Sequence, residues 1–187
     1  MEALLLDDAD FQYEAGLVSN HAVESRLADR VGDCFATGDG IAFADYGQEM
    51  VETIHAFSKA AYELFLPSVL LPALPELAER LTRGGTILEL GCGAAQWSIA
   101  LARRGARPVG IDLSSRQLDH ARRLMAEAGV AFPLLNASAE SVPMYDASFD
   151  IVFCDHGAMS FAYPYRTVPE VARLLRPGRL FPFKPHA

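Results

Sequence analysis

Short apolar runs alternate with amphipathic segments from Gly85 to the end of the chain. Strands that alternate with helices form parallel sheets through right-handed crossovers, with helices on both faces. We therefore expect an α/β fold with a doubly wound, mostly parallel sheet. The runs predict strands over Thr86–Leu90, Val109–Asp112, Phe132–Leu135, Phe149–Cys154 and Leu180–Phe183.

The segments between these runs carry apolar residues at helical spacing. In two of them a hydroxyl residue is followed three positions later by Gln or Glu, which is a capping-box pattern: Ser114 with Gln117, and Thr167 with Glu170. The predicted helices are one that buries Trp97, Ala100 and Leu101 and ends at Gly105, one from Ser114 to Gly129, and one from Thr167 to the stop at Pro177-Gly178.

Residues 1–82 are predominantly helical in pattern. We expect helices around Ala22–Arg30, from Asp45 to a stop at Pro67, and over Pro75–Leu81. The sequence thus predicts an N-terminal helical cap segment, residues 1–82, followed by the α/β core, residues 83–187.

Composition narrows the classes of partner. The chain has 187 residues, 51% of them hydrophobic, and a formal charge of −8, which disfavours binding to nucleic acid. Its most apolar stretch, Leu64–Leu77, is short and interrupted by prolines, and the acidic start resembles no targeting peptide. The three cysteines show no metal-ligand spacing. We expect a soluble, cytoplasmic protein with reduced thiols, no metal site and no membrane partner.

The stretch "TILELGCGAAQ" holds the candidate chemistry, because Glu89, Gly91 and Gly93 follow one another where a strand becomes a helix. Ligands of doubly wound sheets lie beyond the carboxyl ends of the strands. Asp112 ends the second strand, where a carboxylate can accept hydrogen bonds from ribose hydroxyls. Together these residues indicate a nucleoside-containing cofactor.

Two other interpretations of the glycines remain open. They can serve a structural turn alone. A dinucleotide is disfavoured because Gln96 stands where its fingerprint has a third small residue, and because Glu89 would repel a diphosphate.

The ordered series "ILELGCGAAQ", "GIDLS", "NASAESVPMYDASFDIVFCD" and "EVARLLRPG" resembles the class I S-adenosylmethionine-dependent methyltransferases, especially the small-molecule type-11-like group. The resemblance implies a Rossmann-like core of strand order 3-2-1-4-5, S-adenosyl-L-methionine as cofactor and a small-molecule methyl acceptor. It also implies the cofactor-binding residues: Glu89, Gly91, Cys92 and Gly93 at the methionine moiety, Asp112 at the ribose, Leu113 and the pair Ser138 and Ala139 at the adenine, and Asp155 where cofactor and acceptor meet.

His156, next to Asp155, is the candidate catalytic residue. Histidine is a frequent general base. The alternative is a polar loop residue, because methyl transfer from a sulfonium often needs only alignment. Cys92 and Cys154 are expected to be small buried thiols.

The resemblance is incomplete at the C-terminal end, where "RPGRLFPFKPHA" stands in place of the family's last two strands. Pro182 and Pro185 confine the fifth strand to a sheet edge. Two expectations follow: a possible homo-oligomer through the open edge, and, as the alternative function, a non-catalytic S-adenosylmethionine-binding remnant or interaction protein.

Overall fold

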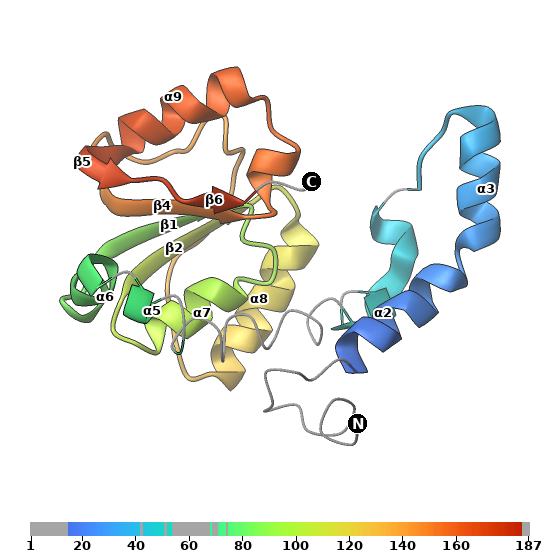
Figure 1. The fold of residues 1–187 in the computed structure, drawn as a ribbon, viewed down its shortest axis with the longest axis horizontal. Coiled ribbons are helices and arrows are strands. Elements are labelled where there is room, and N and C mark those ends of the chain that lie inside the picture. The colour runs from blue at the N-terminus through green and yellow to red at the C-terminus, as the bar shows by residue number, and fades with distance from the viewer. Residues whose placement is uncertain are drawn as a thin grey trace. The chain divides into compact units, whose positions relative to one another are not determined.

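The computed structural model describes residues 15–41, 43–50, 52–53, 68, 71–73 and 75–184. The chain divides into two compact units, residues 1–70 and 71–187. Figure 1 shows the sheet and its helices, which belong to the second unit. That the first unit acts as a cap stays a prediction.

The described part of the first unit is helical. It contains α2 (Ala15–Ser25), α3 (Ala28–Thr37) and the short 3-10 helix η1 (Phe43–Tyr46). The single helix expected around Ala22–Arg30 is wrong, because bonds from Arg26 N to Val23 O and from Leu27 N to Glu24 O close a turn between α2 and α3. Most of the helix expected from Asp45 to Pro67 lies outside the described residues.

The second unit begins with α5 (Leu71–Ala73) and α6 (Pro75–Thr82), and the latter confirms the helix predicted over Pro75–Leu81. The sheet then forms in the order β3-β2-β1-β4-β5, and all of its paired strands run parallel. This confirms the predicted doubly wound, Rossmann-like architecture. Its elements are β1 (Thr86–Leu90), α7 (Gln96–Ala102), β2 (Arg107–Asp112), α8 (Ser115–Glu127), β3 (Leu134–Asn136), β4 (Phe149–Asp155), η3 (Ala158–Ser160), α9 (Pro164–Leu174), β5 (Leu175–Leu180) and β6 (Phe183–Lys184).

Helices cover both faces of the sheet, as Figure 1 shows, with α9 on one side and α7 and α8 on the other. The larger core packs α9 against the sheet through Leu88, Val152, Val171 and Leu174, all nearly inaccessible to solvent. A smaller cluster joins the start of α7 to α8 on the opposite face. Burial on both faces explains why the strands read as continuous apolar runs.

The two predicted helix caps have opposite outcomes. Ser114 caps α8, since its hydroxyl accepts a hydrogen bond from the amide of Gln117 at 3.3 Å. The cap predicted at Thr167 is wrong, because α9 starts at Pro164, whose ring suits a first helical position. Thr167 lies inside the helix and its hydroxyl donates to the Tyr163 carbonyl at 3.2 Å.

The fifth strand also differs from the prediction. It runs over Leu175–Leu180 instead of Leu180–Phe183, and its register against β4 shifts between Leu175 and Leu180. Pro177 and Gly178, expected to be a simple stop, form this irregularity within the strand, where Gly178 has a φ of +72°. The chain then pairs again with the end of β4 through β6.

Polar side chains fasten the amino end of β1 to β4 and β5. Asp150 of β4 accepts from both the amide and the hydroxyl of Thr86 at 3.0 Å, and from Arg176 of β5 at 2.6 Å. This connection lies at the end of β1 opposite to Glu89 and Gly91.

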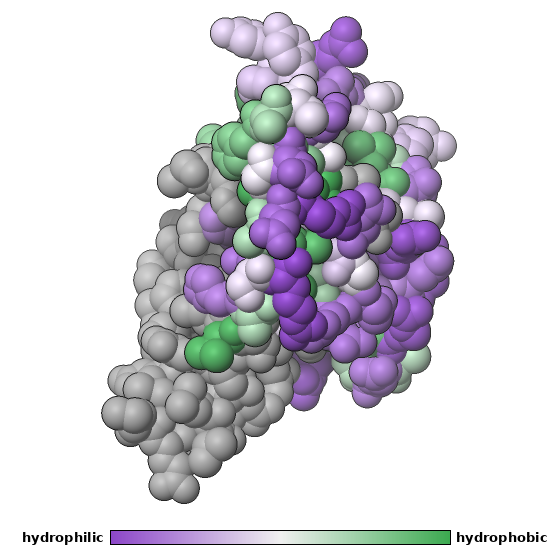
Figure 2. Space-filling model, turned by 90° about the vertical axis from the view of Figure 1, so that its right-hand side faces the viewer, coloured by the Kyte–Doolittle hydropathy of each residue, from purple (hydrophilic) through white to green (hydrophobic). Residues whose placement is uncertain are grey.

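Among the residues that the structure describes, no helix is long and apolar enough to cross a membrane. Among the coloured residues in Figure 2, hydrophilic ones predominate, and hydrophobic ones lie between them.

Replacing Asp150 with Asn should lower the free energy of unfolding by roughly 1–2 kcal/mol at pH 7. Burial raises the pKa of Asp150, but hydrogen bonds from Thr86 and Arg176 outweigh it and bring the pKa from 3.8 to about 2. Since the folded pKa is depressed, the stabilisation is full above the unfolded pKa and is lost as the pH falls through the folded one.

Urea unfolding of wild type and variant at pH 7 and pH 2 measures this. Asp119 is exposed and forms an ion pair with Arg122 on the surface of α8, so it gives the control substitution Asp119→Asn, with little change expected. A difference between wild type and Asp150→Asn that is the same at both pH values would contradict the assignment.

Candidate functional site

The predicted site residues follow the carboxyl ends of four neighbouring strands. Glu89, Gly91, Cys92 and Gly93 lie at or after the end of β1. The others lie at or after the ends of β2 (Asp112 and Leu113), β3 (Ser138 and Ala139) and β4 (Asp155 and His156). Because the strands are parallel and ordered 3-2-1-4-5, these loops share one edge of the sheet, on both sides of the point where strand order reverses.

Glu89 is a buried carboxylate, only 4% exposed, in the interior of the sheet. Its Oε2 accepts hydrogen bonds from the amide of Ser98 at 3.1 Å and from the Ser98 hydroxyl at 2.6 Å. Helix α7 begins after Ala95, whose side chain makes no cap hydrogen bond. Glu89 therefore supplies, from β1, the acceptor that an N-cap side chain normally offers to the first turn of a helix.

The environment of Glu89 favours its protonated form. Burial is the main cause and raises its pKa to about 8, against the opposing hydrogen bonds from Ser98. The carboxylates of Asp155 and Asp112 also raise it. Three carboxylates thus interact at this edge, and a cationic ligand here would be stabilised by all of them.

The two glycines of the first loop have different structural reasons. Gly91 has a φ of +68°, and a Cβ there would overlap the backbone of Ala158 and Gly157 in the loop after β4. Gly93 has a φ of +52°, yet a Cβ there would meet nothing closer than Gln117 Oε1 at 3.9 Å. Gly91 thus permits two loops to pack backbone against backbone, and the space beside Gly93 is open to a ligand.

Asp112 organises the loops on both sides of it. Its Oδ2 accepts from the amide of Gly93 and its Oδ1 from the amide of Ser114, both at 2.8 Å. The side chain of Asn136, at the end of β3, donates to the carbonyls of Asp112 and Leu113, each at 2.9 Å. Sequence reasoning missed Asn136, for which only its place at a strand end gave a signal.

Leu113 projects from this arrangement. Its side chain is 74% exposed, although its own carbonyl and the amide of Ser114 are held by hydrogen bonds. A large apolar side chain fixed in solvent at a strand end is suited to packing against a flat apolar group of a ligand.

Cys92 points away from the edge. Its sulfur lies so close to Gly110 that a Cβ on that glycine would approach it at 2.8 Å, and it packs with Ala95, Leu118 and Ala121. Burial raises the pKa of the Cys92 thiol, which keeps it neutral. Cys92 and Cys154 are buried free thiols, as predicted. The role of Cys92 in binding stays a prediction.

After β3, Ser138 and Ala139 open the next loop. The Ser138 hydroxyl accepts from the amide of Glu140 at 3.1 Å, and Ala139 is 5% exposed. Their expected contact with an adenine stays a prediction.

After β4, Asp155 and His156 adjoin Trp97 of α7. The Trp97 indole N–H donates to Asp155 Oδ2 at 2.8 Å. The prediction that Trp97 is a core residue was therefore incomplete, since it is half-buried and orients a candidate site carboxylate. His156 has a φ of +53°, and its Nε2 lies 3.8 Å from Asp155 Oδ1.

Within the described ranges, no group of His, Cys, Asp and Glu side chains is arranged to hold a metal ion.

Glu89→Gln should stabilise the protein more at pH 8 than at pH 5. The folded pKa of about 8 lies above the ordinary 4.5, so wild type loses stability as the pH rises between these values, while the amide does not ionise. The expected change in the difference between the two proteins is on the order of a few kcal/mol, from chemical denaturation at both pH values. Glu127→Gln, on the exposed end of α8, is the matched control. Equal differences at pH 5 and pH 8 would refute the raised pKa.

Residues 87–178 match the family described as a methyltransferase domain. The chain is 40% identical over 114 residues to a dimethylglycine N-methyltransferase of Parasynechococcus marenigrum, a match that covers 59% of this chain and 41% of that protein. It is 38% identical over 96 residues to a ubiquinone biosynthesis O-methyltransferase of Aromatoleum aromaticum, covering 51% of this chain and 41% of the other. The chain thus spans about two-fifths of the length of these relatives.

The fold agrees with these matches. A crystal structure of a putative sarcosine dimethylglycine methyltransferase from Galdieria sulphuraria superposes with a TM-score of 0.58 at 21% identity, over 68% of this chain and 47% of that one. With the strand order and the loops described above, these findings show that residues 87–178 belong to the methyltransferase domain family and have the class I methyltransferase fold.

Proposed function

We propose that this protein transfers a methyl group from S-adenosyl-L-methionine to a small-molecule acceptor. The observation that carries the proposal is the position of three acidic side chains, Glu89, Asp112 and Asp155, at the carboxyl ends of neighbouring parallel strands in a methyltransferase domain. The cofactor has an ammonium and a sulfonium, and a nearby cation favours the ionised form of a buried carboxyl group of raised pKa such as that of Glu89.

The residues at this edge fit the parts of the cofactor. We assign Glu89, Gly91, Cys92 and Gly93 to the methionine moiety. The buried carboxyl group of Glu89 and the open side of Gly93 support the assignment, whereas the Cys92 side chain is turned towards Gly110. Asp112 is assigned to the ribose hydroxyls, because each carboxylate oxygen retains a lone pair beside the amide bond that it accepts.

The adenine is assigned to two neighbouring loops. Exposed Leu113 would pack against its face, and Ser138 and Ala139 would meet its edge. Asp155, which accepts a hydrogen bond from the Trp97 indole, is assigned to the place where cofactor and acceptor meet.

S-adenosyl-L-methionine supplies an electrophilic methyl group on a positively charged sulfur. The contribution of the chain is then to align the acceptor with that methyl group and to exclude water. We propose His156 as the general base that removes a proton from the acceptor. The alternative is that His156, which has a left-handed backbone conformation, only helps to set the path of the loop after β4.

A small-molecule acceptor is supported by the names of the relatives, one for an N-methyltransferase of dimethylglycine and one for an O-methyltransferase of ubiquinone biosynthesis. One relative is named for methylation of nitrogen and the other for methylation of oxygen. We therefore propose the class of acceptor, a small molecule, without the accepting atom. The formal charge of −8 argues against a nucleic-acid acceptor.

Two features support further parts of the proposal. Leu180 and Phe183, on the strands beyond β4, are 57% and 51% exposed, which favours a homo-oligomer through this edge. The reduced thiols of the composition favour the cytoplasm.

Calorimetry with S-adenosyl-L-methionine, S-adenosylhomocysteine and NAD tests the cofactor. Binding of the first two without NAD is expected, and binding of NAD alone would overturn the proposal. Turnover against a library of small methyl acceptors tests the transfer. Cofactor binding without turnover on any acceptor would favour the alternative, a non-catalytic S-adenosylmethionine-binding protein of the same fold.

Leu113→Ser should weaken S-adenosylhomocysteine binding about fivefold to tenfold, since roughly 1–1.5 kcal/mol of apolar contact is lost. The melting temperature should hardly change, because Leu113 is mostly exposed in the free protein. Leu180→Ser, also exposed but on β5, is the control and should bind as wild type does. If Leu113→Ser binds S-adenosylhomocysteine as tightly as wild type does, the adenine does not pack against Leu113.

A further inference from the structure

The loop between β3 and β4, residues 137–148, has little regular structure of its own. Its regular pairing is an isolated bridge between Ser138 and Ser141. Ala139 and Val142 anchor it in the larger core, at 5% and 4% exposure. The loop carries Ser138 and Ala139 to the ligand edge, so its shape decides where their polar atoms lie.

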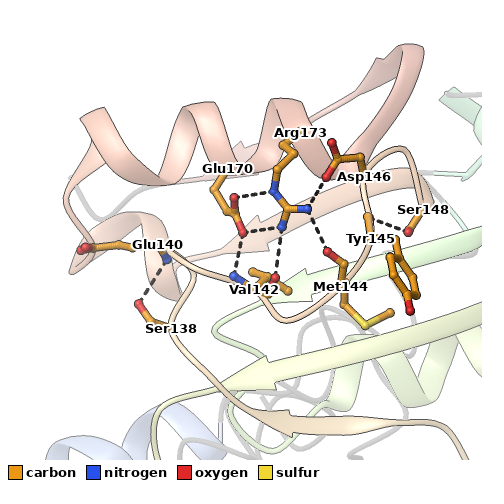
Figure 3. Close-up of polar contacts among 9 residues, drawn as sticks. All are labelled: Ser138, Glu140, Val142, Met144, Tyr145, Asp146, Ser148, Glu170 and Arg173. Carbon is orange, nitrogen blue, oxygen red and sulfur yellow. Dashed lines mark hydrogen bonds and ion pairs between the residues drawn. The ribbon is translucent and has the colours of Figure 1, made fainter.

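Arg173 of α9 forms several hydrogen bonds to this loop, as Figure 3 shows. Its guanidinium donates to the carbonyls of Met144 at 2.8 Å and Val142 at 3.1 Å, and to Asp146 Oδ1 at 2.6 Å. Two more bonds, at 2.8 and 2.7 Å, pair it in parallel with the carboxylate of Glu170. These bonds use all three nitrogens of the planar fork, a geometry that a lysine ammonium does not reproduce.

Glu170, on the same helix, also binds this loop. Besides Arg173, its Oε1 accepts the amide of Val142 at 2.7 Å. Hydrogen bonding to Arg173 lowers the pKa of Glu170, so the pair is charged at neutral pH. Val142 is thereby held at both its amide and its carbonyl.

The start of α9 holds the other part of the loop. The amide of Tyr163 donates to Glu140 Oε1 at 2.9 Å, and Arg166 pairs with Glu140 at 3.5 Å. Glu140 in turn donates its own amide to the Ser138 hydroxyl. A chain of polar contacts therefore runs from α9 to Ser138.

Docking of α9 does not explain these contacts. The helix already buries Thr167, Val171 and Leu174 against the sheet, each at 2% exposure or less. The Arg173 side chain remains 32% exposed, and its bonds outside the helix go to the loop. What they fix is the path of the loop.

We propose that Arg173, with Glu170, is a positioning residue of the cofactor site, which holds the loop after β3 so that Ser138 and Ala139 meet the adenine. This inference rests on the proposed function. Arg173 touches no ligand in this account and acts through the loop.

The test is calorimetry of S-adenosylhomocysteine binding to the full chain, well below the melting temperature. Arg173→Lys should bind at least tenfold more weakly than wild type. Glu170→Gln, a milder change that keeps an oxygen for the Val142 amide, should weaken binding severalfold. It supplies the answer if Arg173→Lys does not fold.

The control is Arg176→Lys. Arg176 makes an ion pair of the same 2.6 Å length, with Asp150, and its side chain is 40% exposed, but it lies at the amino end of β1. Arg176→Lys should lose stability and bind S-adenosylhomocysteine as wild type does. If Arg173 had a purely structural role, Arg173→Lys would behave in the same way.

A double-mutant cycle then locates the effect. The affinity losses of Arg173→Lys and Ser138→Ala should be less than additive in the double variant, because both act on the same loop. Wild-type affinity in folded Arg173→Lys and Glu170→Gln, or additive losses in the cycle, would overturn the inference. Absence of binding by wild type would instead contradict the proposed function.

Discussion

The carboxylate of Glu89 is the constraint on which the first loop of this domain depends. It is buried among the strands, and its stabilising partners are the amide and hydroxyl of Ser98. Because Ala95 offers no side-chain cap, the same carboxylate also satisfies the first turn of α7. A single acidic residue thus draws strand and helix together and leaves a carboxylate of raised pKa beside Gly91 and Gly93.

The other loops of the edge are held by comparable polar contacts. Asp112 accepts hydrogen bonds from the amides of Gly93 and Ser114. Asn136 donates to the carbonyl of Leu113, and Trp97 donates to Asp155. At the opposite end of β1, the bonds of Asp150 to Thr86 and Arg176 fasten the strands themselves. The proposed cofactor site is therefore built on backbone positions that side chains fix before any ligand binds, which reduces the entropy lost on binding.

The fold was largely predictable because apolar strands buried on both faces leave a strong signal in the sequence. The predicted strand Thr86–Leu90 has the bounds of β1, and the strand order is as expected. The errors lie where local signals compete with tertiary contacts. Thr167 and Glu170 have the spacing of a capping box, but Pro164 starts the helix earlier and Glu170 turns to Val142 and Arg173.

The positions of the candidate site residues at the strand ends were predictable, but their contacts were not. Strand ends and glycines indicate the ligand edge of the sheet. No sequence pattern predicts that Gly91 packs against Gly157, or that the Cys92 side chain lies against Gly110. Both facts depend on contacts between residues far apart in the chain.

If the buried carboxyl group of Glu89 binds a cationic ligand, it should lose its proton when the ligand binds, and the protons released can be counted. Calorimetry of S-adenosylhomocysteine binding at pH 7, in buffers of different ionisation enthalpy, counts them. With a pKa of about 8, Glu89 is mostly protonated in the free protein, so we predict release of most of one proton, and none from this group in Glu89→Gln. If wild type and Glu89→Gln release the same number of protons on binding, Glu89 does not ionise beside the ligand.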